Sequence, residues 1–258
     1  MTSDQTAVIF LLFVVAAPVL WAAIGFLQSP FPPLKTCLYF ANLLLTRLLW
    51  SAGSNRRLPV DAGQGAVIIS NHRSSVDPFF LQWTTRRLIH WMVAREYCEH
   101  LAFGWFLRAC EVIPVNRGGI DTESTKRAIR RARRGELVGM FPEGRINCTD
   151  DLLTSLRPGA IMVAVRAGVP IIPCYLQGAP YRGTAASPFF MRAKVRVFYG
   201  DPIDLSEFRD RLNDRVLAGE LMVRCARVLA SLAGDADFQP RLAGRHWKPV
   251  GDQVTGRM

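Results

Sequence analysis

The sequence predicts an α/β protein, in which a mostly parallel sheet is covered by helices and preceded by an N-terminal membrane helix. From Ala66 onward, short apolar runs typical of buried strands alternate with segments of helical spacing. Such alternation is typical of a parallel sheet with helices packed on its faces. Residues 7–27 form an uncharged apolar run, and about 20 such residues suffice to cross a bilayer. The chain therefore combines a membrane anchor with an α/β domain.

Length and composition support one sizeable domain. The chain has 258 residues, and half of them are hydrophobic. Its 32 Lys and Arg outnumber its 21 Asp and Glu, which gives a net charge of +11. This excess indicates an anionic partner, such as a membrane surface, a phosphorylated substrate or nucleic acid. The six cysteines form no C-x-x-C pair, so neither a zinc site nor a disulfide framework is indicated. We interpret them as reduced thiols in a cytosol-facing protein.

Residues 1–53 are predicted to form the membrane anchor and an interfacial helix. Residues 1–5 lack the positive charge of a signal peptide, so the apolar run is interpreted as a retained anchor. Basic residues follow the run, beginning with Lys35, and the positive-inside rule then places the N-terminus outside. The prediction is a single-pass membrane protein with its domain on the cytoplasmic face. Residues 38–50 are apolar but contain Arg47, which fits an interfacial helix or, equally, an ordinary core helix.

Residues 54–235 are predicted to form the α/β domain. Residues 236–258 are predicted to form a loosely ordered tail rich in Gly, Pro and charged residues. No internal repeat or linker divides the domain. Period-2 and continuous apolar runs predict strands at 66–70, 90–94, 112–115, 137–141, 171–175 and 194–198. Helical spacing predicts helices near 79–87, 103–110, 122–134, 159–167 and 209–233.

The predicted helix at 122–134 is unusually basic. It carries six Lys and Arg residues around a narrow apolar stripe of Ala128, Ile129 and Ala132. Such a run is commonly a solvated face. Beside a membrane anchor it also suits acidic headgroups, at roughly 1 kcal/mol per basic residue near the surface. Nucleic acid is not favoured, because the sequence contains no recognition module with aromatic stacking positions.

His72 and Asp77 lie at the predicted turn between the strand 66–70 and the following helix. Asp77 before Pro78 is a helix-start signal, with Asp77 as the predicted N-cap. A loop can fold this carboxylate back onto the imidazole five residues earlier. An imidazole held at one nitrogen by a carboxylate presents the other nitrogen as a base near neutral pH. A bland alternative is that Asp77 is only a cap and His72 only a loop residue.

Three further stretches follow or flank predicted strands. The run V-I-P-V-N-R-G-G carries Arg117 into a glycine-flanked turn, where a guanidinium suits a phosphate. The run F-P-E-G-R places Glu143, Gly144 and Arg145 together in a loop, and V-P-I-I-P enters a strand through Pro170. We expect these segments to share the edge of the sheet where such folds place their sites.

These blocks together resemble the PlsC-like glycerolipid acyltransferase family, which includes 1-acylglycerol-3-phosphate acyltransferases. The matching segments are N-H-x4-D at 71–77, I-P-V-N-R at 113–117, F-P-E-G at 141–144 and V-P-I-I-P at 169–173. The resemblance implies a glycerol-3-phosphate acyltransferase-like fold, with His72 as general base and Asp77 orienting it. It also implies acceptor binding by Arg117, Glu143 and Gly144, and a place for Pro170 on the acyl-chain side.

One departure concerns the acceptor. The family's third block often reads Glu-Gly-x-Arg, whereas here Arg145 directly follows Gly144 and Ile146 takes the usual arginine position. We expect Arg145 to bind the acceptor phosphate from its shifted position, or to serve a different headgroup.

The expected reaction moves a fatty acyl group from a thioester to the hydroxyl of a lysophospholipid. The acyl group of the thioester is carried by coenzyme A or by acyl carrier protein. The expected acceptor is 1-acylglycerol-3-phosphate, which gives phosphatidic acid, and no metal or cofactor is expected. Alternatives are another lysolipid or amino-acid lipid as acceptor, a serine hydrolase using Ser74 or Ser75, and a lipid-binding module without turnover. The hydrolase is disfavoured because G-x-S-x-G is absent and both serines stand too close to His72 in sequence.

Overall fold

The computed structural model describes residues 3–116, 121–211 and 215–243. Within them the chain forms a seven-stranded sheet of order β1-β7-β6-β2-β5-β3-β4, in which β6 and β7 are antiparallel and every other pair is parallel. The mostly parallel sheet predicted from the sequence is confirmed. The strands are β1 (Gly53–Ser54), β2 (Ala66–Ser70), β3 (Ile89–Ala94), β4 (Ile113–Val115), β5 (Leu137–Met140), β6 (Ile171–Gln177) and β7 (Arg196–Tyr199).

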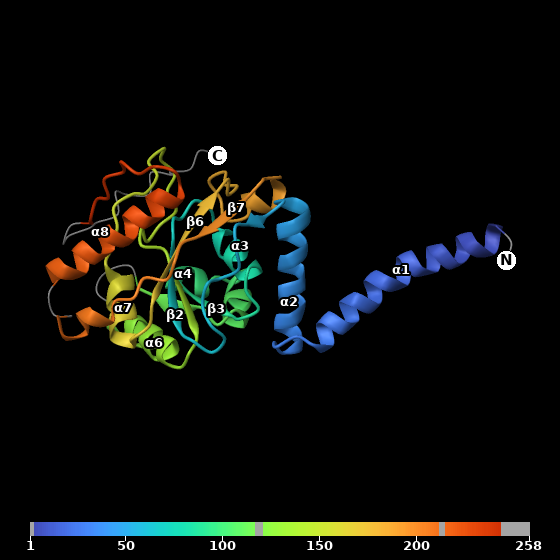
Figure 1. The fold of residues 1–258 in the computed structure, drawn as a ribbon, viewed down its shortest axis with the longest axis horizontal. Coiled ribbons are helices and arrows are strands. Elements are labelled where there is room, and N and C mark those ends of the chain that lie inside the picture. The colour runs from blue at the N-terminus through green and yellow to red at the C-terminus, as the bar shows by residue number, and fades with distance from the viewer. Residues whose placement is uncertain (1–2, 117–120, 212–214, 244–258) are drawn as a thin grey trace.

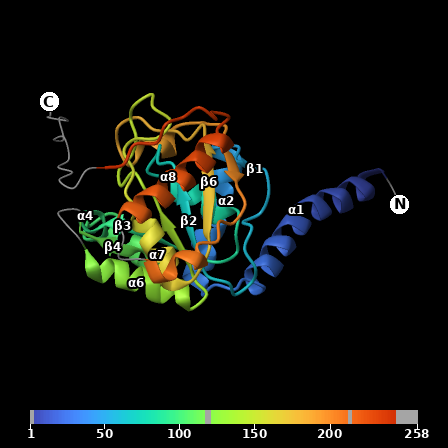
Figure 2. The same cartoon turned by 60° about the vertical axis from the view of Figure 1, so that its left-hand side comes forward.

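Helices cover both faces of the sheet (Figure 1, Figure 2). One core lies between the sheet and α6 (Thr122–Arg133), α7 (Gly159–Ala167) and α8 (Arg215–Leu232). The other lies beneath α3 (Asp77–Trp83) and Trp50. The remaining helices are α1 (Ser3–Leu27), α2 (Pro33–Leu44), α4 (Arg95–Cys98) and α5 (Gly104–Ala109), with a π turn at Leu45–Leu49 and 3₁₀ turns at Ser187–Phe190 and Ser206–Arg211.

The central strand β2 explains why the sequence pattern was continuous rather than alternating. All five of its residues are buried, because both faces of the sheet are covered. The predicted ends of two helices are wrong. The helix expected at 79–87 begins at Asp77 and ends at Trp83, and the one expected at 209–233 is a 3₁₀ turn followed by α8.

The segment after the apolar run is packed on the domain rather than separate from it. Asn42 donates a hydrogen bond to the carbonyl of Phe79 at 3.0 Å, and Thr46 and Trp50 are fully buried. Gly53 and Ser54 pair with β7, so the sheet begins before the expected boundary at residue 54. The opposite side of the segment exposes Leu34, Leu44 and Leu48. The segment therefore combines the two alternatives left open by the sequence. One side packs on the domain like a core helix, and the other exposes apolar side chains like an interfacial helix.

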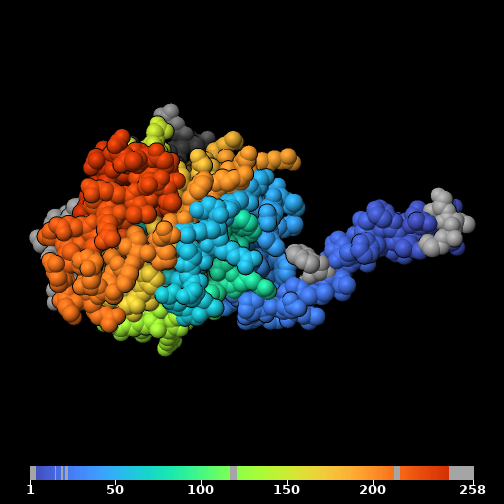
Figure 3. All heavy atoms as spheres, in the orientation of Figure 1, coloured from blue at the N-terminus to red at the C-terminus, as the bar shows by residue number. Residues whose placement is uncertain are grey.

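Helix α1 is long and apolar enough to cross a membrane. Within Asp4–Leu27, the most apolar window of 18 residues has a mean hydropathy of 2.7, and none of that window is buried. Figure 3 shows it standing away from the rest of the molecule. It is the only such helix among the described residues.

The C-terminal segment is docked as far as the structure describes it. Leu156 donates to the carbonyl of Arg241 at 2.8 Å, and Ala243 donates to the carbonyl of Leu156 at 2.9 Å. The sequence predicts a loose tail from residue 236, whereas backbone pairing fixes residues 241–243. Residues 244–258 lie outside the described part.

Candidate active site

The loop after β2 brings His72 and Asp77 together. His72 Nδ1 lies 2.9 Å from Asp77 Oδ2, and the same oxygen accepts hydrogen bonds from the backbone N–H groups of Arg73 at 2.7 Å and Ser74 at 2.8 Å. The Asp77 side chain is fully buried, and that of His72 is 17% exposed. Since a carboxylate oxygen surrounded by donors acts as acceptor, Nδ1 carries the proton and Nε2 is left with a free lone pair. The predicted contact is confirmed, and its geometry is that of an oriented base.

The sequence predicts Asp77 as the N-cap of the helix, and this prediction is wrong. Val76 takes the N-cap position, no side chain caps α3, and Asp77 is its first residue. The reason is that the carboxylate is turned back toward the loop, where it accepts hydrogen bonds from two backbone N–H groups and the imidazole. The bland alternative of a capping aspartate therefore does not describe this site.

The imidazole of His72 is also stacked on an aromatic ring. The His72 and Phe141 rings are nearly parallel, 6° apart, with centroids 3.9 Å from each other. Trp91 lies behind Phe141 at 4.6 Å and 14°. A Cβ at Gly139 would lie 2.5 Å from the Trp91 ring, so only glycine leaves room for the indole over β5. The predictions from sequence do not include this stack, although a glycine inside a strand is a signal for a close approach.

Glu143 fixes the loop that carries His72. Its Oε1 accepts the backbone N–H of His72 at 2.9 Å, and its Oε2 accepts the N–H and hydroxyl of Thr154, both at 2.8 Å. Glu143 is 2% exposed. In this structure both oxygens serve protein donors, which makes Glu143 a positioning residue. Its expected contact with the acceptor stays a prediction.

Neither serine beside His72 is arranged as a nucleophile. The Ser74 hydroxyl is buried and donates to the carbonyl of Pro180, and the Ser75 hydroxyl donates to the carbonyl of Ala185 at 2.8 Å. Both hydroxyls therefore anchor the loop that follows β6. The nearby Cys174 is also inert, because burial, reinforced by the Asp77 carboxylate, raises the pKa of its thiol. These contacts argue against the hydrolase alternative.

The predicted acceptor groups meet this site only in part. Gly144 adopts φ +70°, in the turn that follows β5, and Arg145 is half-buried beside it. Arg157, which the sequence analysis missed, lies with its Nε 3.8 Å from where a Cβ of Gly144 would stand. The prediction for Arg117 lies outside the described residues. Among the described residues, no group of His, Cys, Asp or Glu is placed to hold a metal.

Pro170 does not share the edge of the sheet with His72. It stands just before β6, where its carbonyl accepts from Val67 near the start of β2. His72 follows the other end of β2, and the two strands are parallel. The expectation that all four blocks meet at one edge is therefore wrong for Pro170, because this block enters its strand whereas the others leave theirs.

Comparison with known proteins fits this geometry. The sequence profile of the family described as Acyltransferase matches residues 54–177, which include the His72 loop, Phe141 and Glu143. These residues, just under half of the chain, therefore form an acyltransferase domain. The chain is an acyltransferase, and the family prediction made from its four blocks is confirmed.

Individual relatives agree with this assignment. The chain is 28% identical over 156 residues to the 1-acyl-sn-glycerol-3-phosphate acyltransferase of Bacillus subtilis, covering 60% of this chain and 74% of that one. It is 25% identical over 179 residues to the enzyme of the same name from Streptococcus pneumoniae, covering 66% and 64%. The crystal structure of PlsC from Thermotoga maritima has the same fold, with a TM-score of 0.53 at 18% identity over 87% of this chain and 99% of that one.

The stack behind His72 yields a testable prediction for this acyltransferase. Gly139→Ala should displace Trp91, and through Phe141 the imidazole, so we expect a lower kcat at unchanged substrate KM. Overpacking of this kind also costs about 1–3 kcal/mol of stability. Steady-state kinetics and thermal unfolding measure the two effects.

A double-mutant cycle with Trp91→Leu tests the cause. The indole Nε1 is buried and has no hydrogen-bond partner among the described residues, so this substitution breaks no hydrogen bond there. Gly139→Ala should cost much less activity in the Trp91→Leu background. Equal costs in both backgrounds would contradict transmission through the stack.

Proposed function

We propose that this enzyme transfers a fatty acyl group from an acyl thioester to the hydroxyl of 1-acylglycerol-3-phosphate, forming phosphatidic acid. His72 Nε2 takes the proton of the acceptor hydroxyl as its oxygen attacks the thioester carbonyl. The tetrahedral oxyanion then collapses, the carbon–sulfur bond breaks, and the thiolate receives the proton from the imidazolium. The observation that carries this proposal is the His72–Asp77 pair, with Nδ1 held at 2.9 Å and Nε2 free.

The assignment of the acceptor rests on the named relatives and on arginines at the loop after β5 and after β4 in the sequence. The relatives from Bacillus subtilis and Streptococcus pneumoniae act, by name, on 1-acylglycerol 3-phosphate. Arg145 and Arg157 lie at the loop after β5, and Arg117, which lies outside the described residues, follows β4 in the sequence. Guanidiniums bind phosphate monoesters by charge-assisted, often bidentate hydrogen bonds. Acyl-CoA or acyl carrier protein is the proposed donor, and the reaction as written needs no further cofactor.

The proposed location is a single-pass membrane protein with the acyltransferase domain on the cytoplasmic face. Helix α1 supplies the span, and the basic residues that follow it favour the cytoplasmic side. The segment that follows this span in the chain exposes Leu34, Leu44 and Leu48. The positive charge of the chain suits a membrane that contains anionic lipids.

One assay separates the proposed reaction from its alternatives. The detergent-solubilised full chain is incubated with labelled acyl thioester, with and without 1-acylglycerol-3-phosphate. Transfer consumes both substrates and forms labelled phosphatidic acid. Release of free fatty acid without the acceptor would indicate hydrolysis, and consumption of neither would indicate a binding protein. A parallel panel of zwitterionic lysolipids and amino-acid lipids tests the acceptor.

The acceptor phosphate gives a second prediction. Arg117→Ala and Arg145→Ala should each raise the KM for 1-acylglycerol-3-phosphate far more than the KM for the acyl donor. Losing a hydrogen bond to a charged group costs about 1.5–3 kcal/mol, which is roughly tenfold to over a hundredfold. Initial rates at varied acceptor and donor measure both constants, with exposed Arg192→Ala as the control.

The two arginines can be told apart. If only Arg117→Ala raises the acceptor KM, Arg145 has a structural role in its loop. If neither does, the acceptor is not a phosphate monoester, and the zwitterionic lysolipids or amino-acid lipids of the panel replace it.

A further inference from the structure

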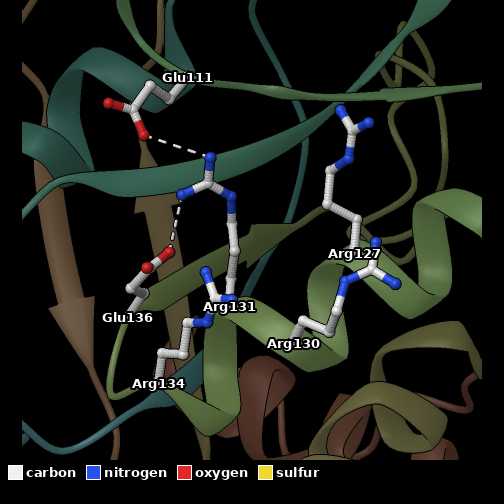
Figure 4. A pocket seen from close by; sticks show the side chains of 6 residues that line it. All are labelled: Glu111, Arg127, Arg130, Arg131, Arg134 and Glu136. Atoms are coloured by element: carbon white, nitrogen blue, oxygen red, sulfur yellow. Dashed lines mark hydrogen bonds and ion pairs between the residues drawn. The ribbon is translucent and has the colours of Figure 1, made fainter.

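A second basic site lies away from His72, along the exposed side of α6. Arg127, Arg130, Arg131 and Arg134 line a cleft of about 420 Å³ together with Glu111 and Glu136 (Figure 4). The arginines are spaced i, i+3, i+4 and i+7, so they form one stripe on the helix. The two glutamates come from the residues just before β4 and β5. The cleft is thus at the starting ends of these strands, whereas His72 follows the far end of β2.

Only one of the four arginines is neutralised by the glutamates. Arg131 lies between them, 3.2 Å from Glu111 and 2.7 Å from Glu136, as the dashed lines in Figure 4 show. Arg130 pairs with Glu123 at 3.0 Å on the exposed surface. Within the described residues, the guanidinium groups of Arg127 and Arg134 make no hydrogen bond or ion pair. Like charges three and four residues apart destabilise a helix. An anion between these guanidiniums would relieve that repulsion.

The surroundings of the cleft place it near the exit of the membrane span. Lys35, at the start of α2, is bonded to Glu111 in the wall of the cleft. Arg86 donates to the carbonyl of Gln28, directly after α1, at 3.3 Å. The end of α1 and the cleft therefore lie on the same side of the domain, and headgroups around α1 are the nearest source of phosphate. Forked guanidiniums match the oxygens of a phosphate group.

We propose that this cleft binds the phosphate of an anionic membrane lipid that is neither acceptor nor product of the reaction. The proposal rests on the membrane location put forward above, and it assigns the anionic lipid to named residues. Arg127 and Arg134 contact the phosphate, while Arg131 and its two glutamates keep the wall of the cleft rigid. The lipid thereby connects α6 to the membrane surface.

Thermal unfolding of the detergent-solubilised full chain tests this site. The additives are short-chain phosphatidylglycerol, short-chain phosphatidylcholine and inorganic phosphate. Phosphatidylglycerol, a phosphodiester, should raise the melting temperature, and phosphatidylcholine should not. In Arg127→Gln/Arg134→Gln the half-saturating concentration of phosphatidylglycerol should rise at least tenfold. Lys126→Gln/Lys194→Gln removes two charges from exposed positions outside the cleft and should leave it unchanged.

The outcomes separate the site from the reaction. Without additives the double arginine variant should melt no lower than the parent, because it loses repulsion and no side-chain contact among the described residues. Equal lipid shifts in the parent and in this variant would overturn the site. Equal shifts by inorganic phosphate and phosphatidylglycerol would overturn the lipid as its ligand. Acyl transfer is measured in the same preparations. If phosphatidylglycerol does not shift the melting temperature but transfer is intact, only this inference is rejected. If the shift is present but transfer is missing, only the proposed reaction is rejected.

Discussion

His72→Ala is expected to reduce acyl transfer by about 10²- to 10⁴-fold, the usual contribution of a positioned general base. In the proposed reaction the imidazole takes the proton of the acceptor hydroxyl, and none of the described neighbouring side chains is placed to replace it. Ser74 and Ser75 are bonded to backbone carbonyls, and the Cys174 thiol is buried. The measurement is kcat with acyl thioester and 1-acylglycerol-3-phosphate.

The fold should tolerate this change. The backbone of His72 is held independently of its ring, by Glu143 and by the N–H of Asn147 on its carbonyl at 2.7 Å. Circular dichroism and the melting temperature should therefore stay close to those of the parent. His100→Ala, at an exposed loop histidine, is the matched control and should keep full activity. Activity of His72→Ala within tenfold of the parent would remove His72 as the base.

The parts of the fold that the sequence predicted well are those fixed by local pattern. The continuous apolar run at β2 and the spacing of α7 each match the structure to the residue. All of β2 is buried and so is most of α7, and both have clear ends. The His72–Asp77 contact was predictable too, because a short loop between a strand and a helix leaves few ways to place two such side chains.

The parts that failed depend on contacts between distant segments. The side of α2 facing the domain is polar, with Thr36 and Asn42 buried, so hydrophobic spacing did not reveal which side packs. Pro170 looked like a member of the site because its block matched the family, but spacing in sequence does not give the direction of a strand. The stack of His72, Phe141 and Trp91 joins three strands, and no local pattern contains it.

Asp77→Asn is the second large effect that the geometry predicts. Three donors, the imidazole Nδ1–H and the N–H groups of Arg73 and Ser74, converge on one oxygen of Asp77. An asparagine must therefore place its amide oxygen there, which keeps the loop and the orientation of the imidazole. The negative charge is lost, however, and with it the stabilisation of the imidazolium that forms during transfer. The other oxygen of Asp77 has no partner among the described residues, so the new amide NH₂ breaks no existing hydrogen bond.

We expect kcat to fall roughly tenfold to over a hundredfold, since a hydrogen bond to a charged group contributes about 1.5–3 kcal/mol. The KM for both substrates should stay near that of the parent, because the Asp77 side chain is fully buried and not exposed to a ligand. Asp61→Asn, at an exposed loop position, is the control for the loss of one negative charge. Full activity of Asp77→Asn with an unchanged melting temperature would mean that the carboxylate only shapes the loop, and that the imidazole works as a base without its charge.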